Sequence, residues 1–165
     1  MKSLVILMTG MLGFTNIFCQ SAKAEFNEAC EKGNAGLYKA AINLFTRCIE
    51  IEPNLAEAYF NRAIFKNKIS DYNEAIIDFT KAKDLNPKLS AAAYANMAVS
   101  KIYLKDYKGS IAHCTKALEL DSSLSMVYFN RYISKQQLNL FFCDDLKKAM
   151  ELGVENAKKI LSIGL

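Results

Sequence analysis

Apolar positions recur with a helical period along most of the chain. In residues 72–85 they follow the i, i+3, i+4, i+7 spacing that gathers side chains on one buried helical face. A second amphipathic stretch, with Ala58, Tyr59, Ala63, Phe65 and Ile69, precedes it, and Ser70-Asp71 supplies turn and N-cap chemistry between the two. The pattern predicts two helices joined as a hairpin. The apolar set of the second helix is Tyr72, Ala75, Ile76, Phe79, Ala82 and Leu85, and Asn73, Glu74, Asp78, Lys81 and Lys83 form its polar side.

This pattern recurs every 34 or 35 residues. Tyr59-Phe60-Asn61-Arg62 returns as Tyr128-Phe129-Asn130-Arg131, and Tyr94-Ala95-Asn96-Met97 keeps the tyrosine and asparagine between them. Pro53 and Pro87 close the first two units, and Ser122 takes the place of a third proline. Because proline cannot continue a helix, each closes its unit just after the second helix. The repetition predicts a stack of similar hairpins.

The second helix of each unit resembles that of a tetratricopeptide repeat. That family's pattern has a small residue, a large apolar residue four positions later, another small residue after three more, and a closing proline. The matching triplets are Ala41-Phe45-Cys48, Ala75-Phe79-Ala82 and, more loosely, Ser110-Cys114-Ala117, with a shortened Phe142-Leu146-Ala149. The resemblance implies an all-α fold, an α-solenoid of about four hairpins plus a C-terminal capping helix. The expected repeats are 22–54, 55–88, 89–123 and 124–153, and the cap is 154–165, with Gly153 ending a helix in the left-handed conformation.

Composition agrees with one helical domain. The 165 residues are 52% hydrophobic and 23% charged, with Gly 7 and Pro 2, too few turn formers for a sandwich or barrel. The net charge is +4, and the basic residues are scattered among acidic ones. Without a basic stripe, the sequence does not indicate a nucleic-acid partner.

The first 21 residues differ from the rest of the chain. Lys2 precedes an apolar run from Leu4 to Phe18, the pattern of a cleaved signal peptide. We therefore expect 22–165 to be the mature domain, exported to the periplasm or secreted. Two alternatives remain open, an uncleaved membrane anchor and a lipoprotein lipidated at Cys19, and only these would bring the chain to a membrane.

Candidate chemistry is sparse. His113 adjoins Cys114, but neighbours on a helix point about 100° apart, so we expect a polar-face histidine and a buried cysteine rather than a catalytic pair. Asp144-Asp145 is interpreted as helix-start capping, and Gly33 to Gly36 as a linker. The sequence contains no CxxC, HxxxH or HExxH motif, so we predict no metal, no cofactor and no enzyme activity.

The cysteines that follow the leader show no disulfide framework. Cys48 stands in a small-residue position and Cys114 in the large apolar position, so both are expected in the core. A Cys30–Cys48 bridge within the first hairpin remains an alternative.

Function is therefore expected from a surface. First helices of such stacks line a concave groove that commonly accepts a peptide or partner protein, so we predict a protein-interaction module. The alternative is a small apolar-ligand carrier, or an enzyme using the groove as a pocket; the oligomeric state is left open. The residues expected at the groove are Asn61, Asn96, Asn130, Phe60, Phe129, Ile64, Ile133, Lys68 and Tyr103, with Asn67, Val99 and Gln136 among their neighbours.

One specialised activity of the family is not expected. Its chaperone-binding members hold a terminal carboxylate in a clamp of lysine, asparagine and arginine. Here Asn61 matches the middle asparagine, but Phe26, Cys30, Ala92 and Asn96 occupy the other clamp positions.

Overall fold

The computed structural model describes residues 22–140 and 143–162, and within these ranges every regular element is a helix. Helical residues 22–34 come first, and a single 3-10 turn, η1 (Pro87–Leu89), precedes the fifth helix. The α-helices that follow 22–34 are α2 (Tyr38–Ile51), α3 (Ala56–Lys68), α4 (Tyr72–Leu85), α5 (Ser90–Tyr103), α6 (Tyr107–Leu120), α7 (Ser125–Gln137), α8 (Cys143–Glu151) and α9 (Glu155–Ser162).

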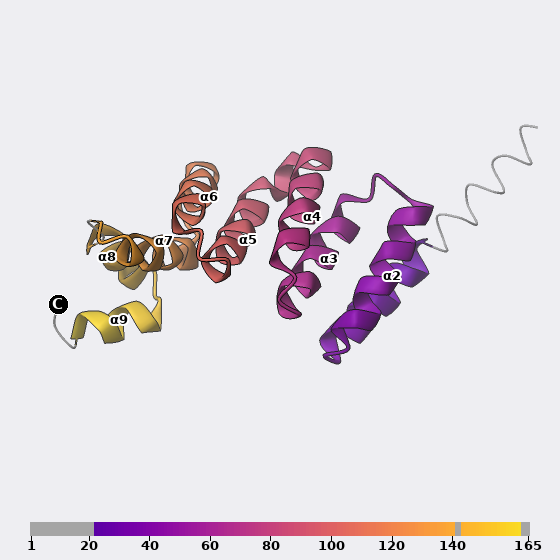
Figure 1. Cartoon of the computed structure of the whole chain (residues 1–165), viewed down its shortest axis with the longest axis horizontal. Helices are drawn as coiled ribbons and strands as arrows, with labels where there is room; N and C mark the ends of the chain where they lie inside the picture. Colours follow the sequence, from indigo (N-terminus) through magenta and orange to yellow (C-terminus); the bar gives the residue numbers. More distant parts are fainter. Residues whose placement is uncertain (1–21, 141–142, 163–165) are drawn as a thin grey trace, which may run out of the picture.

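The helices stack in chain order into an elongated row (Figure 1). Each helix packs chiefly on its neighbours in sequence: α3 on α2 and α4, α5 on α4 and α6, and α7 on α6 and α8. The hairpins are 22–34 with α2, α3 with α4, α5 with α6, and α7 with α8, and α9 packs on α8 at the end of the row. The predicted all-α solenoid with a capping helix is confirmed.

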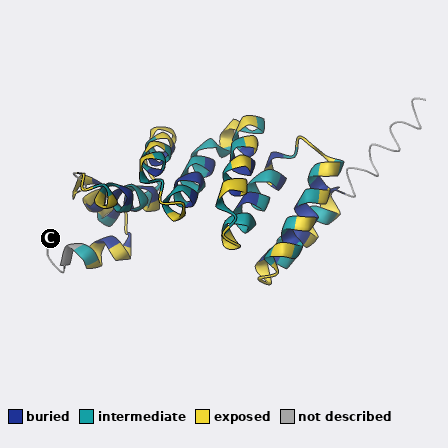
Figure 2. Cartoon of the chain, viewed as in Figure 1, coloured by how far each residue is buried: buried dark blue, intermediate teal, exposed yellow. Residues whose placement is uncertain are grey.

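The core lies where the repeat pattern places large residues. Phe45, Phe79, Cys114 and Leu146 occupy the same position of successive second helices, and all four are fully buried. Phe79 packs edge-on against Phe60 with ring centroids 5.3 Å apart. Buried residues alternate with exposed ones around each helix (Figure 2), as the helical period predicts.

The turns within the hairpins share one backbone conformation. Gly36, Ser70, Lys105 and Asn139 stand at equivalent positions with φ of 78°, 65°, 58° and 54°. Three of these residues carry a Cβ in a region that favours glycine. Gly153, with φ of 92°, ends α8 in the left-handed conformation that the sequence predicts.

Two local predictions were wrong. Gly33 is not part of a linker: it lies buried in the last turn of helix 22–34, where a Cβ would overlap the Phe65 ring. Asp71 makes no side-chain N-cap bond, although the equivalent Asp106 accepts one from the Gly109 N–H at 2.9 Å. Close packing and local side-chain rotamers, which a repeat pattern does not specify, decide both.

The cysteines of the described part of the chain are free thiols. Cys48 and Cys114 are buried, Cys30 is half-buried and Cys143 is exposed. The first two therefore occupy core positions as predicted, and the Cys30–Cys48 bridge is not formed. Burial raises the pKa of Cys48 and that of Cys114 to about 11, which keeps both as protonated thiols near neutral pH.

Within 22–140 and 143–162, no helix combines the length and apolar character needed to cross a bilayer. The predicted leader, Cys19 and Phe142 lie outside the described residues.

Candidate functional site

A pocket of about 350 Å³ opens between the first helices of the second and third hairpins, α3 and α5. The face on which it lies is the one that the repeat pattern predicts for partner binding. Four residues of the predicted groove, Ile64, Lys68, Asn96 and Tyr103, come together here. The remaining lining residues are Asn67, Ser70, Tyr72 and Val99.

A hydrogen bond of the lining residue Asn67 ties the two helices together. Ser100 Oγ and Asn67 Oδ1 are 2.8 Å apart, so the hydroxyl donates from α5 to an amide of α3. Asn96 donates one amide N–H to the Ala92 carbonyl of its own helix at 2.9 Å. An asparagine amide has two N–H groups and a carbonyl oxygen, so Asn96 keeps a donor and an acceptor for a ligand backbone.

An aromatic pair forms one side of the pocket. The rings of Tyr72 and Tyr103 stack with centroids 4.9 Å apart and planes within 1° of parallel. Tyr72 OH donates to Ser70 Oγ at 3.3 Å, and Tyr103 remains 62% exposed. The stack offers a flat apolar surface already held in place, and such exposed rings commonly anchor a partner.

Five predicted groove residues do not line this pocket. Phe60 packs against Phe79, and Phe129 is buried in a cluster with Leu146 and Val154 that also takes in Ile133. Asn61 on α3 and Asn130 on α7 are half-buried outside it. Of the three recurring asparagines, Asn96 lines the pocket, and Asn61 and Asn130 do not.

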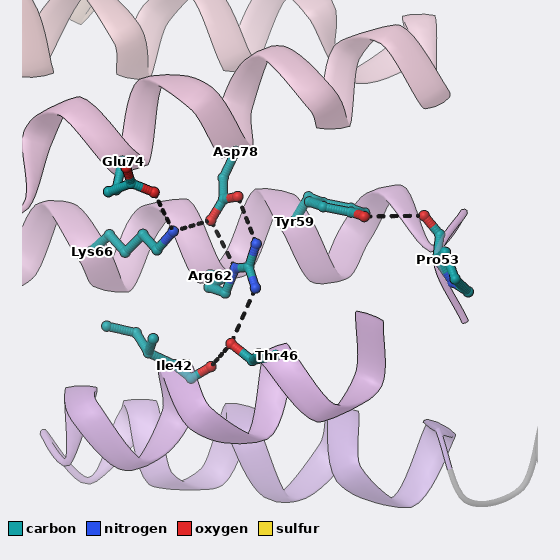
Figure 3. A network of polar contacts seen from close by, with 8 residues as sticks. All are labelled: Ile42, Thr46, Pro53, Tyr59, Arg62, Lys66, Glu74 and Asp78. Atoms are coloured by element: carbon teal, nitrogen blue, oxygen red, sulfur yellow. Dashed lines mark hydrogen bonds and ion pairs between the residues drawn. The ribbon is translucent and has the colours of Figure 1, made fainter. Parts of the chain in front are cut away.

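An ion network on α3, separate from the residues that line the pocket, fixes α3 between α2 and α4 (Figure 3). Arg62 donates to both carboxylate oxygens of Asp78, at 2.8 Å through Nε and at 2.7 Å through Nη2, and its Nη1 donates to Thr46 Oγ1 at 3.1 Å. Lys66 approaches the same Asp78 carboxylate at 2.8 Å. Burial alone would lower the pKa of the Arg62 guanidinium, but the hydrogen bonds that Arg62 donates to Asp78, with the negative charge of that carboxylate, prevail and raise it. The first helix α3 is thus tied to α2 and to α4, the second helices on either side of it.

The fourth hairpin repeats this arrangement. Arg131 binds Asp145 at 2.6 Å and Thr115 at 3.3 Å, and Lys135 binds Asp145 at 2.8 Å. Burial opposes ionisation of Asp145, but the hydrogen bonds from Arg131 and Lys135 prevail and lower its pKa. Both arginines also lie over a tyrosine of their own helix, at 5.5 Å from the Tyr59 ring and 5.7 Å from the Tyr128 ring.

The third hairpin lacks the pair. Met97 and His113 stand at the positions of Arg62 and Asp78, and the Met97 sulfur accepts from Thr80 Oγ1 at 3.5 Å. The His113 ring lies 5.7 Å from that of Tyr94. Burial, with help from the positive charge of Lys101, lowers the pKa of His113 below 6.5.

Three sequence interpretations need correction here. Asp78, assigned to a polar helix face, is only 3% exposed, and Asp145, interpreted as a helix cap, is 4% exposed within its ion network. His113 is half-buried against an aromatic ring rather than on an open polar face. The burial of the two aspartates could have been predicted from the sequence. Arg62 and Arg131 occupy the same position of their repeats, and a buried cation requires an acidic partner.

Two residues that line the pocket, Tyr72 and Ser70, were not among the predicted groove residues. Tyr72 was assigned to the buried face of a second helix, and Ser70 to a turn. Tyr72 is the first residue of α4, and its ring contacts α5 by stacking on Tyr103. Within 22–140 and 143–162, no three His, Cys, Asp or Glu side chains are grouped so as to hold a metal ion.

Comparison with known families identifies the repeats. Models described as tetratricopeptide repeat match residues 22–55, 44–77 and 91–124, which together span more than half of the chain. The chain belongs to the tetratricopeptide repeat family. None of the curated proteins compared with it matches in sequence.

Several solved structures share its fold, two of them tetratricopeptide repeat domains. A crystal structure of MamA superposes with a TM-score of 0.76 at 19% identity, over 84% of this chain and 81% of that one. The TPR2B domain of yeast Sti1, in complex with pHsp70, gives 0.66 at 26% identity over 72% and 98%. The first such domain of Spaghetti (RPAP3), bound to an HSP90 peptide, gives 0.68 at 20% identity over 73% and 94%.

Proposed function

We propose that this chain is a non-catalytic protein-interaction module that binds an extended peptide segment in the pocket between α3 and α5. The observation that carries the proposal is the convergence of the Asn96 amide with the Tyr72–Tyr103 stack in one cavity on first helices. The amide pairs with a peptide backbone, and the stacked rings take an apolar side chain.

Two similar structures support a peptide as the ligand. The Sti1 domain is in complex with pHsp70, and the Spaghetti domain is bound to an HSP90 peptide. The carboxylate clamp of chaperone-binding members is not matched here, because Phe26, Cys30 and Ala92 occupy clamp positions. We therefore infer that the ligand is an internal peptide segment, with Lys68 at the pocket favouring an acidic residue nearby.

The expected affinity is moderate. A neutral hydrogen bond contributes about 0.5–1.5 kcal/mol net, and an aromatic anchor at an interface contributes about 2 kcal/mol or more. One pocket of about 350 Å³ with these groups is therefore consistent with dissociation constants on the order of micromolar.

Selection from a random peptide library, displayed on phage, tests the proposal with the full chain as target. Enriched peptides are then titrated by fluorescence anisotropy against the unchanged chain and against Asn96→Ala/Tyr103→Ala. We expect the double variant to bind at least about tenfold more weakly, since it loses an amide and half of the stack. Ile77→Ala, which trims a side chain that is 58% exposed on α4, is the control and should bind normally.

Two results would refute the proposal. One is a selection that enriches no peptide above an empty support. The other is equal affinity for the double variant and the control, with helicity shown by circular dichroism to be unchanged. The second result would move binding away from the α3–α5 pocket.

We also propose that the chain is exported and that its leader is removed, on the support of Lys2 and the apolar run from Leu4 to Phe18. Intact mass of the protein from its native cells decides this. A mass lacking residues 1–21 is expected; retention of that segment would refute cleavage, and added acyl mass on Cys19 would indicate a lipoprotein.

A further inference from the structure

A second pocket, of about 390 Å³, opens between helix 22–34 and the link that leads into α3. We call it the N-terminal pocket. Two of its lining residues, Phe26 and Leu55, are apolar, and the Phe26 ring is held edge-on against Phe45 with centroids 5.4 Å apart. The other lining residues are Lys23, Asn27, Glu52 and Glu57. An apolar surface that is already fixed in the core thus meets a few polar groups, which is the usual composition of a ligand pocket.

The N-terminal pocket and the α3–α5 pocket lie on the same face of the solenoid. Asn27 precedes Asn61 by 34 residues, so it is the first member of the row of asparagines that continues with Asn96. Asn27 lines the N-terminal pocket, and Asn96 lines the α3–α5 pocket. Because equivalent residues of successive first helices face the same way, both pockets open on one surface.

One stripe of α3 joins the two pockets. Glu57, Asn61, Ile64 and Lys68 follow i, i+4, i+7 and i+11 spacing, which places them on a single helical face. Glu57 lines the N-terminal pocket, and Ile64 and Lys68 line the α3–α5 pocket. Asn61 lies between them, and its side chain makes no hydrogen bond within the part of the chain that the structure describes. Its amide is therefore free to pair with a backbone that crosses α3.

The two ends of this stripe differ in charge. Lys68 stands at the α3–α5 pocket and forms no ion pair with the other residues that the structure describes. At the N-terminal pocket the carboxylates of Glu52 and Glu57 outnumber the ammonium group of Lys23. A ligand that spans both pockets therefore meets a positive charge at one end and a negative charge at the other.

Neighbouring charges keep the N-terminal pocket acidic. Two nearby pairs are neutral, because Arg47 is bound to Glu25 and Lys83 to Asp84. With the lining residues, the remaining groups of the adjoining turns give five carboxylates against three ammonium groups, a net charge of −2. These remaining groups are Glu28, Glu31, Glu50, Lys32 and Lys88.

The length of α3 sets the spacing of the pockets. Glu57 and Lys68 are eleven residues apart, about 16 Å along a helix that rises 1.5 Å per residue. The pockets also lie on opposite sides of α3, and neighbouring helices are about 8–10 Å apart. Their centres are therefore about 15–20 Å from each other, which an extended peptide spans with about five or six residues.

We propose that the peptide bound in the α3–α5 pocket crosses α3 obliquely and also fills the N-terminal pocket. The ligand is then an extended segment with two large apolar residues about five or six positions apart. An acidic residue accompanies the one at Lys68, and a basic residue accompanies the one at Glu52 and Glu57. The inference rests on the proposed peptide-binding function, and it adds a second site and the orientation of the ligand.

The test uses peptides selected from the phage library against the full chain. We expect the enriched peptides to share two apolar positions at this spacing, with opposite charges beside them. Fluorescence anisotropy should give about tenfold weaker binding to Glu52→Lys/Glu57→Lys than to the unchanged chain. Glu119→Lys/Glu151→Lys makes the same charge change at exposed residues outside both pockets, so this matched control should bind normally.

A peptide with its basic residue replaced by glutamate shows whether the contact is direct. It should bind the unchanged chain about tenfold more weakly and regain affinity for Glu52→Lys/Glu57→Lys, because the charges are complementary again. The regained affinity also shows that this variant is folded. Three residues inserted between the two apolar positions should weaken binding to the unchanged chain, since the second apolar residue then misses its pocket.

The outcomes separate this inference from the proposed function. If Asn96→Ala/Tyr103→Ala weakens binding but Glu52→Lys/Glu57→Lys does not, the N-terminal pocket is not part of the site and the α3–α5 pocket remains. Failure of the glutamate-substituted peptide to regain affinity, with helicity unchanged by circular dichroism, would also overturn the inference. A selection that enriches no peptide would overturn both proposals.

Discussion

Arg62 and Asp78 face each other across α3 and α4 with two hydrogen bonds, of 2.8 Å and 2.7 Å, and Asp78 is only 3% exposed. Removing one partner of such a pair leaves the other charge buried without compensation. Asp78→Ala is therefore expected to lower the free energy of unfolding by about 3–5 kcal/mol in chemical denaturation.

The third hairpin supplies a control for this prediction. Met97 and His113 replace the ion pair there, so Arg62→Met/Asp78→His installs a combination that the same architecture already accommodates. We expect this double variant to remain within about 1.5 kcal/mol of the unchanged chain. If Asp78→Ala costs less than about 1 kcal/mol, the pair is not the structural link that its geometry indicates.

Phe79→Ala should be among the most destabilising single changes. Its ring is fully buried and clusters with Ala63 of α3 and with Ala93 and Met97 of α5, so truncation opens a cavity among three helices. We expect a loss of about 3–5 kcal/mol, measured by denaturant titration. Ile77→Ala, exposed on the same helix, should change stability by less than about 0.5 kcal/mol, and similar losses for the two variants would show that Phe79 is not core.

His113 should make stability depend on pH. Its pKa in the folded chain lies below the ordinary 6.5 because of burial and the charge of Lys101, so protons bind the unfolded chain more readily. The free energy of unfolding should therefore decrease as pH falls from about 7.5 through the unfolded pKa to the folded one.

The charge of Asp106 raises the pKa of His113 and that of Lys83 lowers it. Both residues stay fully charged over the pH range in which His113 titrates. His113→Gln removes the titrating group but keeps a polar side chain of similar reach. Denaturation at several pH values should give a flatter profile for this variant. An identical pH dependence in the two proteins would rule out His113 as the source.

Lys105 stores local backbone strain. Its φ of 58° is one that glycine adopts without a Cβ penalty, as Gly36 does at the equivalent turn. Lys105→Gly should stabilise the chain by about 0.5–1 kcal/mol in thermal and chemical unfolding. Lys105→Ala, which removes the same charge but keeps a Cβ, should not, and equal effects of the two would attribute the change to charge.

The sequence predicted the elements better than the contacts. Recurring tyrosines, alanines and prolines located the hairpins, because the helical spacing of apolar residues indicates which face of each helix is buried. Phe60 and Phe129, neighbours of the recurring asparagines, were predicted to lie at the groove. In the structure both rings pack into the core, and Phe129 is covered by α8 and α9.

The pocket required contacts between hairpins. Tyr72 belongs to a second helix by its pattern, yet its ring stacks on Tyr103 of the next hairpin's first helix. The buried Asp78 and Asp145 were misassigned because a charged residue on a helix is usually solvated, and only the position of the facing arginine reverses that expectation. Periodicity assigns a residue to a helix face, and the adjacent repeat decides what that face contacts.

Site-specific photocrosslinking tests the central claim most directly. A benzophenone amino acid replaces Tyr103 in one sample and Ile77 in another, both exposed positions on neighbouring hairpins. Each full chain is irradiated with a library-selected peptide, and crosslinked products are mapped by mass spectrometry. Binding in the α3–α5 pocket predicts crosslinks from position 103 and none above background from position 77. Crosslinks from 77 alone, or equally from both, would contradict it.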